Sequence, residues 1–254
     1  MSLLDGGVAI VTGAASGIGR ASALAFAREG ATGVVVADVD EAGGEETAAL
    51  IKESGSEAVF VRCDVSQADE VARMVQTAVD RFGGLDYAHN NAGVGPVPAL
   101  VVDVTEADWD RLMGVHLKGV WLCLKHEIAV MAPHGKGAIV NTASIAGLRG
   151  APMMSVYTAA KHGIVGLTKA VALEYAAAGI RVNTLCPGHT ATPMHGQAGD
   201  GSAAVDGAPP ALGRMPRTSD PSEQAEVAVW LCSDRSSYVT GAALAVDGGQ
   251  TVQL

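Results

Sequence analysis

The feature that most constrains the fold is a regular alternation of short apolar runs with longer helical segments along the whole chain. Short strands made only of apolar residues are buried on both faces, which is typical of a parallel sheet covered by helices. Right-handed crossovers between successive strands then predict a doubly wound α/β fold. We expect strands at residues 8–11, 34–37, 58–61, 85–89, 138–141, 180–185 and 242–246, and helices at 16–28, 40–54, 71–82, 106–131, 155–178 and 223–231.

The same pattern predicts a single domain over residues 1–254, because it contains no linker and no internal repeat. Hydrophobic residues make up 48% of the sequence, which is enough for a large core. One stretch, residues 195–216, is rich in Gly, Ala and Pro and interrupts the alternation. We expect it to be a mobile loop beside the substrate, with a disordered surface segment as the alternative.

Charge and cysteine usage exclude several kinds of partner. The formal net charge of −10 repels nucleic acid and anionic lipid. No apolar segment approaches the about 20 residues needed to cross a bilayer, and residues 1–7 do not resemble a signal peptide. The cysteines form no CxxC pair and the histidines show no HExxH spacing, so we expect neither disulfides nor a metal site. Reduced thiols favour a cytoplasmic protein.

A glycine-rich turn follows the first expected strand and opens the first expected helix. Residues Thr12–Gly19 have the sequence TGAASGIG, with glycines at positions 13, 17 and 19. Glycines let the backbone approach a pyrophosphate closely, and a helix N-terminus favours its negative charge. The turn therefore predicts a dinucleotide site, and a tight turn without a ligand is the alternative.

Asp38 follows the second expected strand, about twenty residues beyond the glycines. A carboxylate at this place can bind both ribose hydroxyls of an adenosine and repels a 2′-phosphate. The glycine turn has Ser16 rather than a basic residue, and Arg20 comes only after it. We therefore expect NAD rather than NADP as the cofactor. The alternative is that Asp38 caps the next helix.

Tyr157 and Lys161 are four residues apart on one expected helix, so their side chains share a face. A free tyrosine has a pKa near 10. We expect the lysine ammonium, together with the positive ring of an oxidised nicotinamide, to lower the pKa of Tyr157 so that it can act as acid and base. Ser144 follows the fifth expected strand, where its hydroxyl can hold a substrate oxygen.

With these residues the chain resembles the short-chain dehydrogenase/reductase family over nearly its whole length. The resemblance implies a Rossmann-type doubly wound fold with a seven-stranded parallel sheet and helices on both faces, and commonly a homotetramer. It implies that Ser144, Tyr157 and Lys161 are catalytic, with Lys161 also bonding the nicotinamide ribose. It implies that Asp64 and Val65 contact adenine. The expected cofactor-binding residues are Gly13, Ser16, Gly17, Ile18, Gly19, Asp38, Asp64, Val65, Asn91, Ala92, Gly93, Tyr157, Lys161, Pro187, Gly188, Thr190 and Thr192.

One position departs from the family pattern. Residues 115–119 have the sequence VHLKG, which places His116 where the family usually has an Asn that anchors a water behind the catalytic lysine. A histidine could hold such a water or gate proton flow by its own titration. The alternative is that His116 only packs in the helix and the proton relay runs elsewhere.

The expected substrate pocket is almost entirely apolar, apart from Arg149 nearby. Methionines suit an adaptable wall. We therefore expect a neutral, hydrophobic secondary alcohol or its ketone as substrate. The expected substrate contacts are Val94, Ile145, Met153, Met154, His189 and Met194.

Three alternative functions are weighed against the alcohol dehydrogenase at this stage. A 3-oxoacyl thioester reductase is a frequent activity in the family, but Asp38 argues against it because such enzymes typically use NADP. A cofactor-sensing protein without catalysis is disfavoured by the joint presence of Ser144, Tyr157 and Lys161. A dehydratase or epimerase of the extended relatives is disfavoured by the chain length and by the lack of a separate substrate domain.

Overall fold

The computed structural model describes residues 2–4, 6–195 and 214–252. Most of the loop expected at residues 195–216 therefore lies outside the described residues. Within its described C-terminal part, the amides of Arg214 and Met215 both donate to the carbonyl of Gly248.

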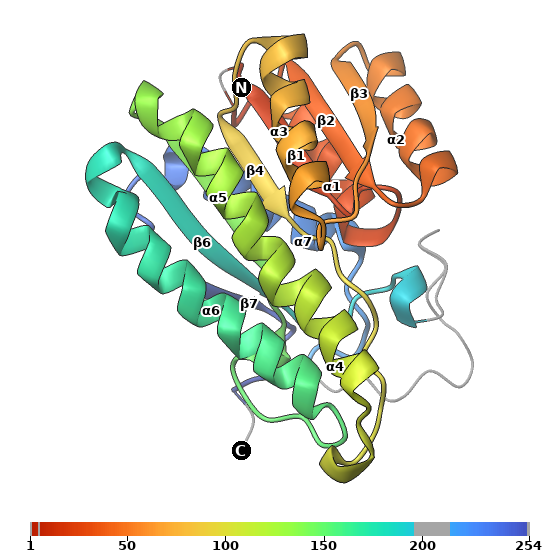
Figure 1. Cartoon of the computed structure of the whole chain (residues 1–254). Coiled ribbons are helices and arrows are strands. Elements are labelled where there is room, and N and C mark those ends of the chain that lie inside the picture. The colour runs from red at the N-terminus through yellow and green to blue at the C-terminus, as the bar shows by residue number, and fades with distance from the viewer. Residues whose placement is uncertain (1, 5, 196–213, 253–254) are drawn as a thin grey trace.

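Seven parallel strands form one sheet in the order β3-β2-β1-β4-β5-β6-β7 (Figure 1). The prediction of a doubly wound, Rossmann-type sheet is confirmed. The strands are β1 Val8–Thr12, β2 Gly33–Asp38, β3 Glu57–Arg62, β4 Tyr87–Asn90, β5 Gly137–Thr142, β6 Ile180–Pro187 and β7 Ala243–Val246.

Helices cover both faces of the sheet, and each face has its own apolar core. One core is shared by the sheet with α3, α5 and α6, which lie together in front of the strands in Figure 1. The other is shared with α1, α2 and α7. The helices are α1 Gly17–Arg28, α2 Glu41–Glu53, α3 Ala68–Phe82, α4 Glu106–Met113, α5 Gly119–Met131, α6 Ser155–Tyr175 and α7 Pro221–Cys232.

The long helix expected at residues 106–131 is helical throughout but is not one regular α-helix. A π-helical turn, η2, at Gly114–Lys118 joins α4 to α5. Such turns insert an extra residue into the helical ladder and are frequent at functional sites. His116 lies in this turn, which also places it against the cavity described below.

A buried polar network crosses one core between the sheet and its helices. Asn90 on β4 donates from Nδ2 to Glu127 on α5 and to Asn141 on β5, each at 3.0 Å. Asn141 in turn donates to Thr168 on α6 at 3.0 Å. Glu127 is fully buried, and its other oxygen has no partner among the described residues. Burial raises the pKa of this carboxyl to about 7, although the bond from Asn90 opposes the shift.

Glu127→Gln is expected to change the pH dependence of stability. The pKa of Glu127 in the folded chain, about 7, lies above its ordinary value of 4.5, so the folded state holds the proton more tightly. The stability that this tighter proton binding contributes is largest below pH 4.5, the ordinary pKa, and is lost as the pH rises towards the folded pKa of about 7. When the pH is raised from about 5.5 to about 8, the free energy of unfolding of the wild type should fall by on the order of 2 kcal/mol relative to that of the glutamine variant. Urea unfolding of both proteins at the two pH values measures this difference, and a constant difference would contradict the prediction.

Candidate active site

A cavity of about 850 Å³ lies where the strands end at their carboxyl edge. Gly13 after β1, Asp38 at the end of β2 and Asn91 after β4 line one half, and Ser144 after β5 and Gly188 after β6 line the other. The strand order reverses between β1 and β4, and ligands of open α/β sheets bind at this kind of crevice. The volume is that of a site for a cofactor and a small substrate.

The start of α1 is built to receive an anion. Ser16, Gly17 and Ile18 line the cavity. The N-cap residue Ser16 makes no side-chain capping bond, and the first turn contains no acidic residue. The free amide groups of this turn and the helix dipole both favour a phosphate. The residues present therefore fit a pyrophosphate.

The third glycine of the turn has a different task from the first two. A Cβ on Gly19 would lie 1.9 Å from the carbonyl oxygen of Gly13, so Gly19 lets the helix approach the turn. It is not among the residues that line the cavity. This close approach gives Gly19 a packing role, and its expected contact with the cofactor stays a prediction.

Asp38 lines the cavity and is held by two backbone amides. One carboxylate oxygen accepts from Ala15 at 2.9 Å and the other accepts from Asp40 at 3.0 Å. The residue that caps α2 is Asp40, not Asp38, so the capping alternative does not describe this carboxylate. Arg20, the basic residue directly after the glycine turn, is bonded to Glu46 at 2.6 Å and to two carbonyls. It does not line the cavity.

Ser144, Tyr157 and Lys161 converge on the other half of the cavity. The Lys161 ammonium is buried, donates to the carbonyl of Thr142 at 3.0 Å and lies 5.5 Å from the centre of the Tyr157 ring. The Ser144 hydroxyl accepts from the amide of Ala146 at 3.1 Å. Three groups that can bind or transfer a proton thus face one space.

Burial dominates the protonation of this cluster in the protein without a bound cofactor. Burial raises the pKa of Tyr157, and its hydrogen bond with Ser144 opposes the shift. Burial also lowers the pKa of Lys161 to about 7. These directions hold for the protein without a bound cofactor. The expected lowering of the Tyr157 pKa by Lys161 together with an oxidised nicotinamide stays a prediction.

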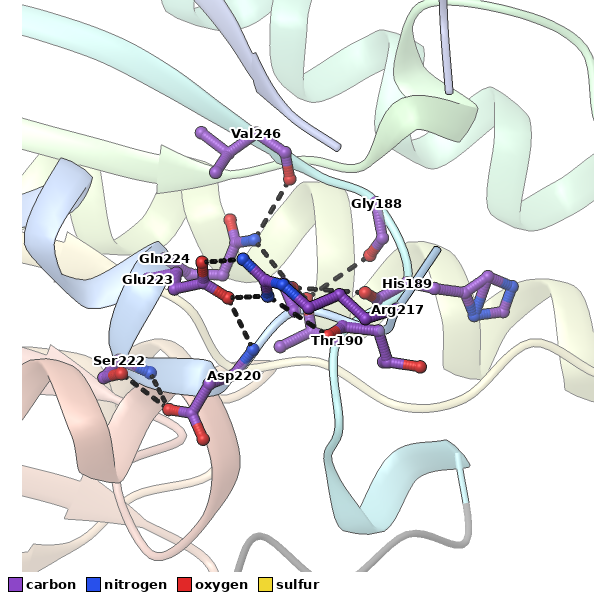
Figure 2. A network of polar contacts seen from close by, with 11 residues as sticks. Gly188, His189, Thr190, Arg217, Asp220, Ser222, Glu223, Gln224 and Val246 are labelled. Atoms are coloured by element: carbon purple, nitrogen blue, oxygen red, sulfur yellow. Dashed lines mark hydrogen bonds and ion pairs between the residues drawn. The ribbon is translucent and has the colours of Figure 1, made fainter. Parts of the chain in front are cut away.

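A hydrogen-bond network holds the segment after β6 in place (Figure 2). The hydroxyls of Thr190 and Ser219 lie 2.9 Å apart, and Ser219 donates to the carbonyl of His189 at 3.1 Å. Gln224 on α7 donates to Ser219 at 3.1 Å and to the carbonyl of Val246 at 3.0 Å. The imidazole of His189 points away from this network and lines the cavity. The expected cofactor residues Pro187, Gly188, Thr190 and Thr192 line it as well.

The remaining expected residues fall into two groups. Those that line the cavity are Asp64, Val65, Ala92, Gly93, Val94, His116, Ile145, Met154 and Met194. Met153 does not line it: its backbone is left-handed, with φ 61°, its side chain is 50% exposed, and its carbonyl accepts from the amide of Ala99. Met153 is thus a turn residue beside the cavity in this structure, and its expected substrate contact stays a prediction.

Sequence reasoning did not place Cys63 and Gln250 at the site, although both line the cavity. Cys63 comes directly before Asp64, and Gln250 follows the Asp-Gly-Gly at residues 247–249. Their position next to these motifs is the only sequence feature that could have placed them at the site.

Two kinds of feature are absent from the described ranges. No group of three or more His, Cys, Asp and Glu side chains there is arranged to hold a metal ion. Nor does any helix in that part of the chain have the length and apolarity to span a bilayer.

Comparison with known proteins agrees with this geometry. A family model described as Enoyl-(Acyl carrier protein) reductase matches residues 13–251. The 2,5-dichloro-2,5-cyclohexadiene-1,4-diol dehydrogenase of Sphingobium indicum is 43% identical over 252 residues, which cover 99% of this chain and 99% of that protein.

Two solved structures match over almost the whole chain. Carveol dehydrogenase from Mycobacterium avium, in complex with NAD, has a TM-score of 0.91 and 29% identity, and covers 100% of both chains. A short-chain type dehydrogenase/reductase from Mycobacterium marinum has a TM-score of 0.90 and 33% identity, and covers 99% of this chain and 98% of the other. The chain belongs to the short-chain dehydrogenase/reductase family, and it is an oxidoreductase.

Proposed function

We propose that this protein is an NAD-dependent dehydrogenase of hydrophobic cyclic secondary alcohols, which also reduces the corresponding ketones. The observation that carries the proposal is the convergence of Ser144, Tyr157 and Lys161 on one cavity with a largely apolar wall. Two of the similar proteins are named as dehydrogenases of cyclic alcohols, a cyclohexadienediol and carveol.

Each residue of the cluster has a distinct role in this proposal. The hydroxyls of Ser144 and Tyr157 hold the substrate oxygen, and Tyr157 takes its proton during oxidation and returns one during reduction. Lys161, tied to the Thr142 carbonyl, holds the nicotinamide ribose and favours the phenolate. Bound NAD supplies the hydride acceptor and a positive ring that further favours the phenolate.

The cofactor half of the cavity supports NAD over NADP. The start of α1 would hold the pyrophosphate, and Asp38 would hold the adenosine ribose. Arg20 is occupied by Glu46, and Arg62 by Glu41 and Glu70. Among the described residues that line the cavity, the only cationic side chains are Arg149 and Lys161, which follow β5 rather than β2. A 2′-phosphate would therefore meet a carboxylate with no cation beside it.

Asp38→Ser is expected to weaken the preference for NAD. The change removes charge-assisted bonds to the ribose, each worth about 1.5–3 kcal/mol, and removes the repulsion of a 2′-phosphate. The ratio of kcat/KM for NADP to that for NAD should rise about 10–100-fold. Asp40→Ser is the matched control, because this nearby carboxylate caps α2 and does not line the cavity. Equal ratios in both variants would show that Asp38 does not select the cofactor.

A substrate panel tests the function as a whole. Initial rates of NADH formation should be highest with cyclic secondary alcohols such as cyclohexanol and its alkyl derivatives, and much lower with NADP. The panel includes a 3-hydroxyacyl thioester, because the matching family model is described by an acyl carrier protein reductase. Turnover of only the thioester, or of only charged alcohols or sugars, would refute the proposed substrate class.

The setting of the enzyme also belongs to the proposal. We infer a single-domain cytoplasmic enzyme that assembles as a homotetramer and has no nucleic-acid or membrane partner. Trp109 on α4 and Trp121 on α5 support assembly, since both are nearly half exposed. The net charge of −10 argues against acidic partners. Light scattering on the purified protein measures the mass of the assembly.

A further inference from the structure

His116 is a deeply buried histidine, and one of its two ring nitrogens is hydrogen-bonded. It lies in the π-helical turn between α4 and α5, with only 1% of its surface exposed. Its Nε2 is 2.9 Å from the carbonyl oxygen of Val94. A carbonyl can only accept, so Nε2 carries the proton and donates it. The other nitrogen, Nδ1, is buried and has no partner among the described residues.

The charges around the ring favour its uncharged form. Burial lowers the pKa of His116 well below its ordinary value, and the positive charges of Lys161 on α6 and Arg111 on α4 lower it further. The bond to Val94 raises the pKa, and this effect is weaker than those of burial and of Lys161 but stronger than that of Arg111. With Nε2 protonated and the ring neutral, Nδ1 is a bare acceptor. A proton relay through this ring would have to break its bond to Val94.

The ring also contacts the acid/base tyrosine. The centres of the His116 and Tyr157 rings are 5.2 Å apart and their planes differ by 88°, which is an edge-to-face contact. On the other side, a Cβ on Gly93 would lie 2.8 Å from Cε1 of His116. The imidazole therefore fills the space between Tyr157 and the backbone of residues 93–94.

This placement joins two walls of the cavity. Val94 follows β4 and lines the substrate side, whereas Tyr157 stands on α6. No hydrogen bond among the described residues joins these two directly, and His116 contacts both. Moving the imidazole would therefore change the distance between the substrate wall and the proton-transferring hydroxyl.

We propose that His116 is a positioning residue that ties the substrate wall at Val94 to Tyr157 through its Nε2–H bond and its ring contact, and that it carries no proton of the reaction. The proposal rests on the proposed dehydrogenase function. On this proposal, the histidine that stands at the family's usual Asn position holds Tyr157 in place, and it is not a titrating group of a proton relay.

Two variants separate the bond from the ring contact. His116→Gln keeps an N–H donor that can reach the Val94 carbonyl, and His116→Phe keeps an aromatic ring against Tyr157 but has no donor. The glutamine variant keeps the bond and loses only the ring contact, so it should raise KM for the alcohol by no more than about 3-fold. The phenylalanine variant should raise that KM about tenfold, because a buried carbonyl loses its partner. KM for NAD should change in neither variant, and kcat/KM should keep its pH profile in the glutamine variant.

The opposite results would overturn the inference. A shifted or flattened pH profile in His116→Gln would make the histidine a titrating relay, and an unchanged KM in His116→Phe would remove the role of the bond. Loss of turnover in the wild type itself would be a failure of the proposed function instead.

One measurement does not depend on activity. In protein carrying 15N-labelled histidine, the signal missing from His116→Gln identifies the ring. Its nitrogen shifts should show the Nε2–H form and stay constant from about pH 6 to about pH 9. A ring that titrates in this interval, or that carries its proton on Nδ1, would refute the tether even in an inactive protein.

Discussion

Tyr157→Phe is expected to lower kcat at saturating NAD and alcohol by about 1,000-fold. The change removes one hydroxyl, the group that takes the substrate proton, and general acid–base groups contribute about 10²–10⁴-fold to rates. The phenyl ring can keep the contacts that the tyrosine ring makes with His116 and Lys161. The cavity should therefore keep its shape, so KM for NAD should change little. Initial rates with cyclohexanol measure the loss, and NADH fluorescence measures binding.

The matched control removes the hydroxyl of a tyrosine that lies far from the proposed chemistry in the sequence. Tyr238 is fully exposed, and Tyr238→Phe should leave the rate unchanged. A wild type that turns over no alcohol, together with a Tyr157→Phe variant that binds NADH like the wild type, would favour a cofactor-sensing protein. A variant that keeps most of the wild-type rate would place the acid/base on another group.

The fold was predictable because its strongest signal is local. Burial on both faces makes each strand a short apolar run, so the strands were found with boundaries within about two residues. The π-helical turn at Gly114–Lys118 was not found. It has the same composition as the α-helix around it, and its extra residue is set by packing rather than by propensity.

The candidate site was predictable where a residue stands next to a strand end. Parallel strands bring their carboxyl ends to one edge, so Asp38 and Ser144 had to approach the same crevice. Side-chain direction and protonation were not predictable in this way. Met153 has a left-handed backbone and does not line the cavity, and the pKa of Tyr157 is raised by burial that no local pattern reveals.

A second large effect is expected on stability, at the far end of the helix that supports the cofactor segment. Arg181 on β6 makes five hydrogen bonds around the C-terminus of α7. They run to the carbonyls of Leu231, Cys232, Ser233 and Val239 and to the hydroxyl of Ser236, at 2.7 to 3.3 Å. The last carbonyls of a helix have no partners within it, and a cation there also stabilises the helix dipole.

Arg181→Met should therefore lower the free energy of unfolding by about 3 kcal/mol, because it leaves these carbonyls without their charged donor. Arg181→Lys should recover only part of this loss, since one ammonium cannot reach five acceptors that a planar guanidinium spans. Urea unfolding at one fixed protein concentration measures both variants.

The matched control is Arg235→Met, because Arg235 is exposed and lies just after the end of α7 in the sequence. If Arg181→Met and Arg235→Met shift the midpoint equally, Arg181 does not hold the end of α7. If only Arg181→Met shifts it and KM for NAD also rises, α7 links the stability of the chain to its cofactor site through Gln224 and Ser219.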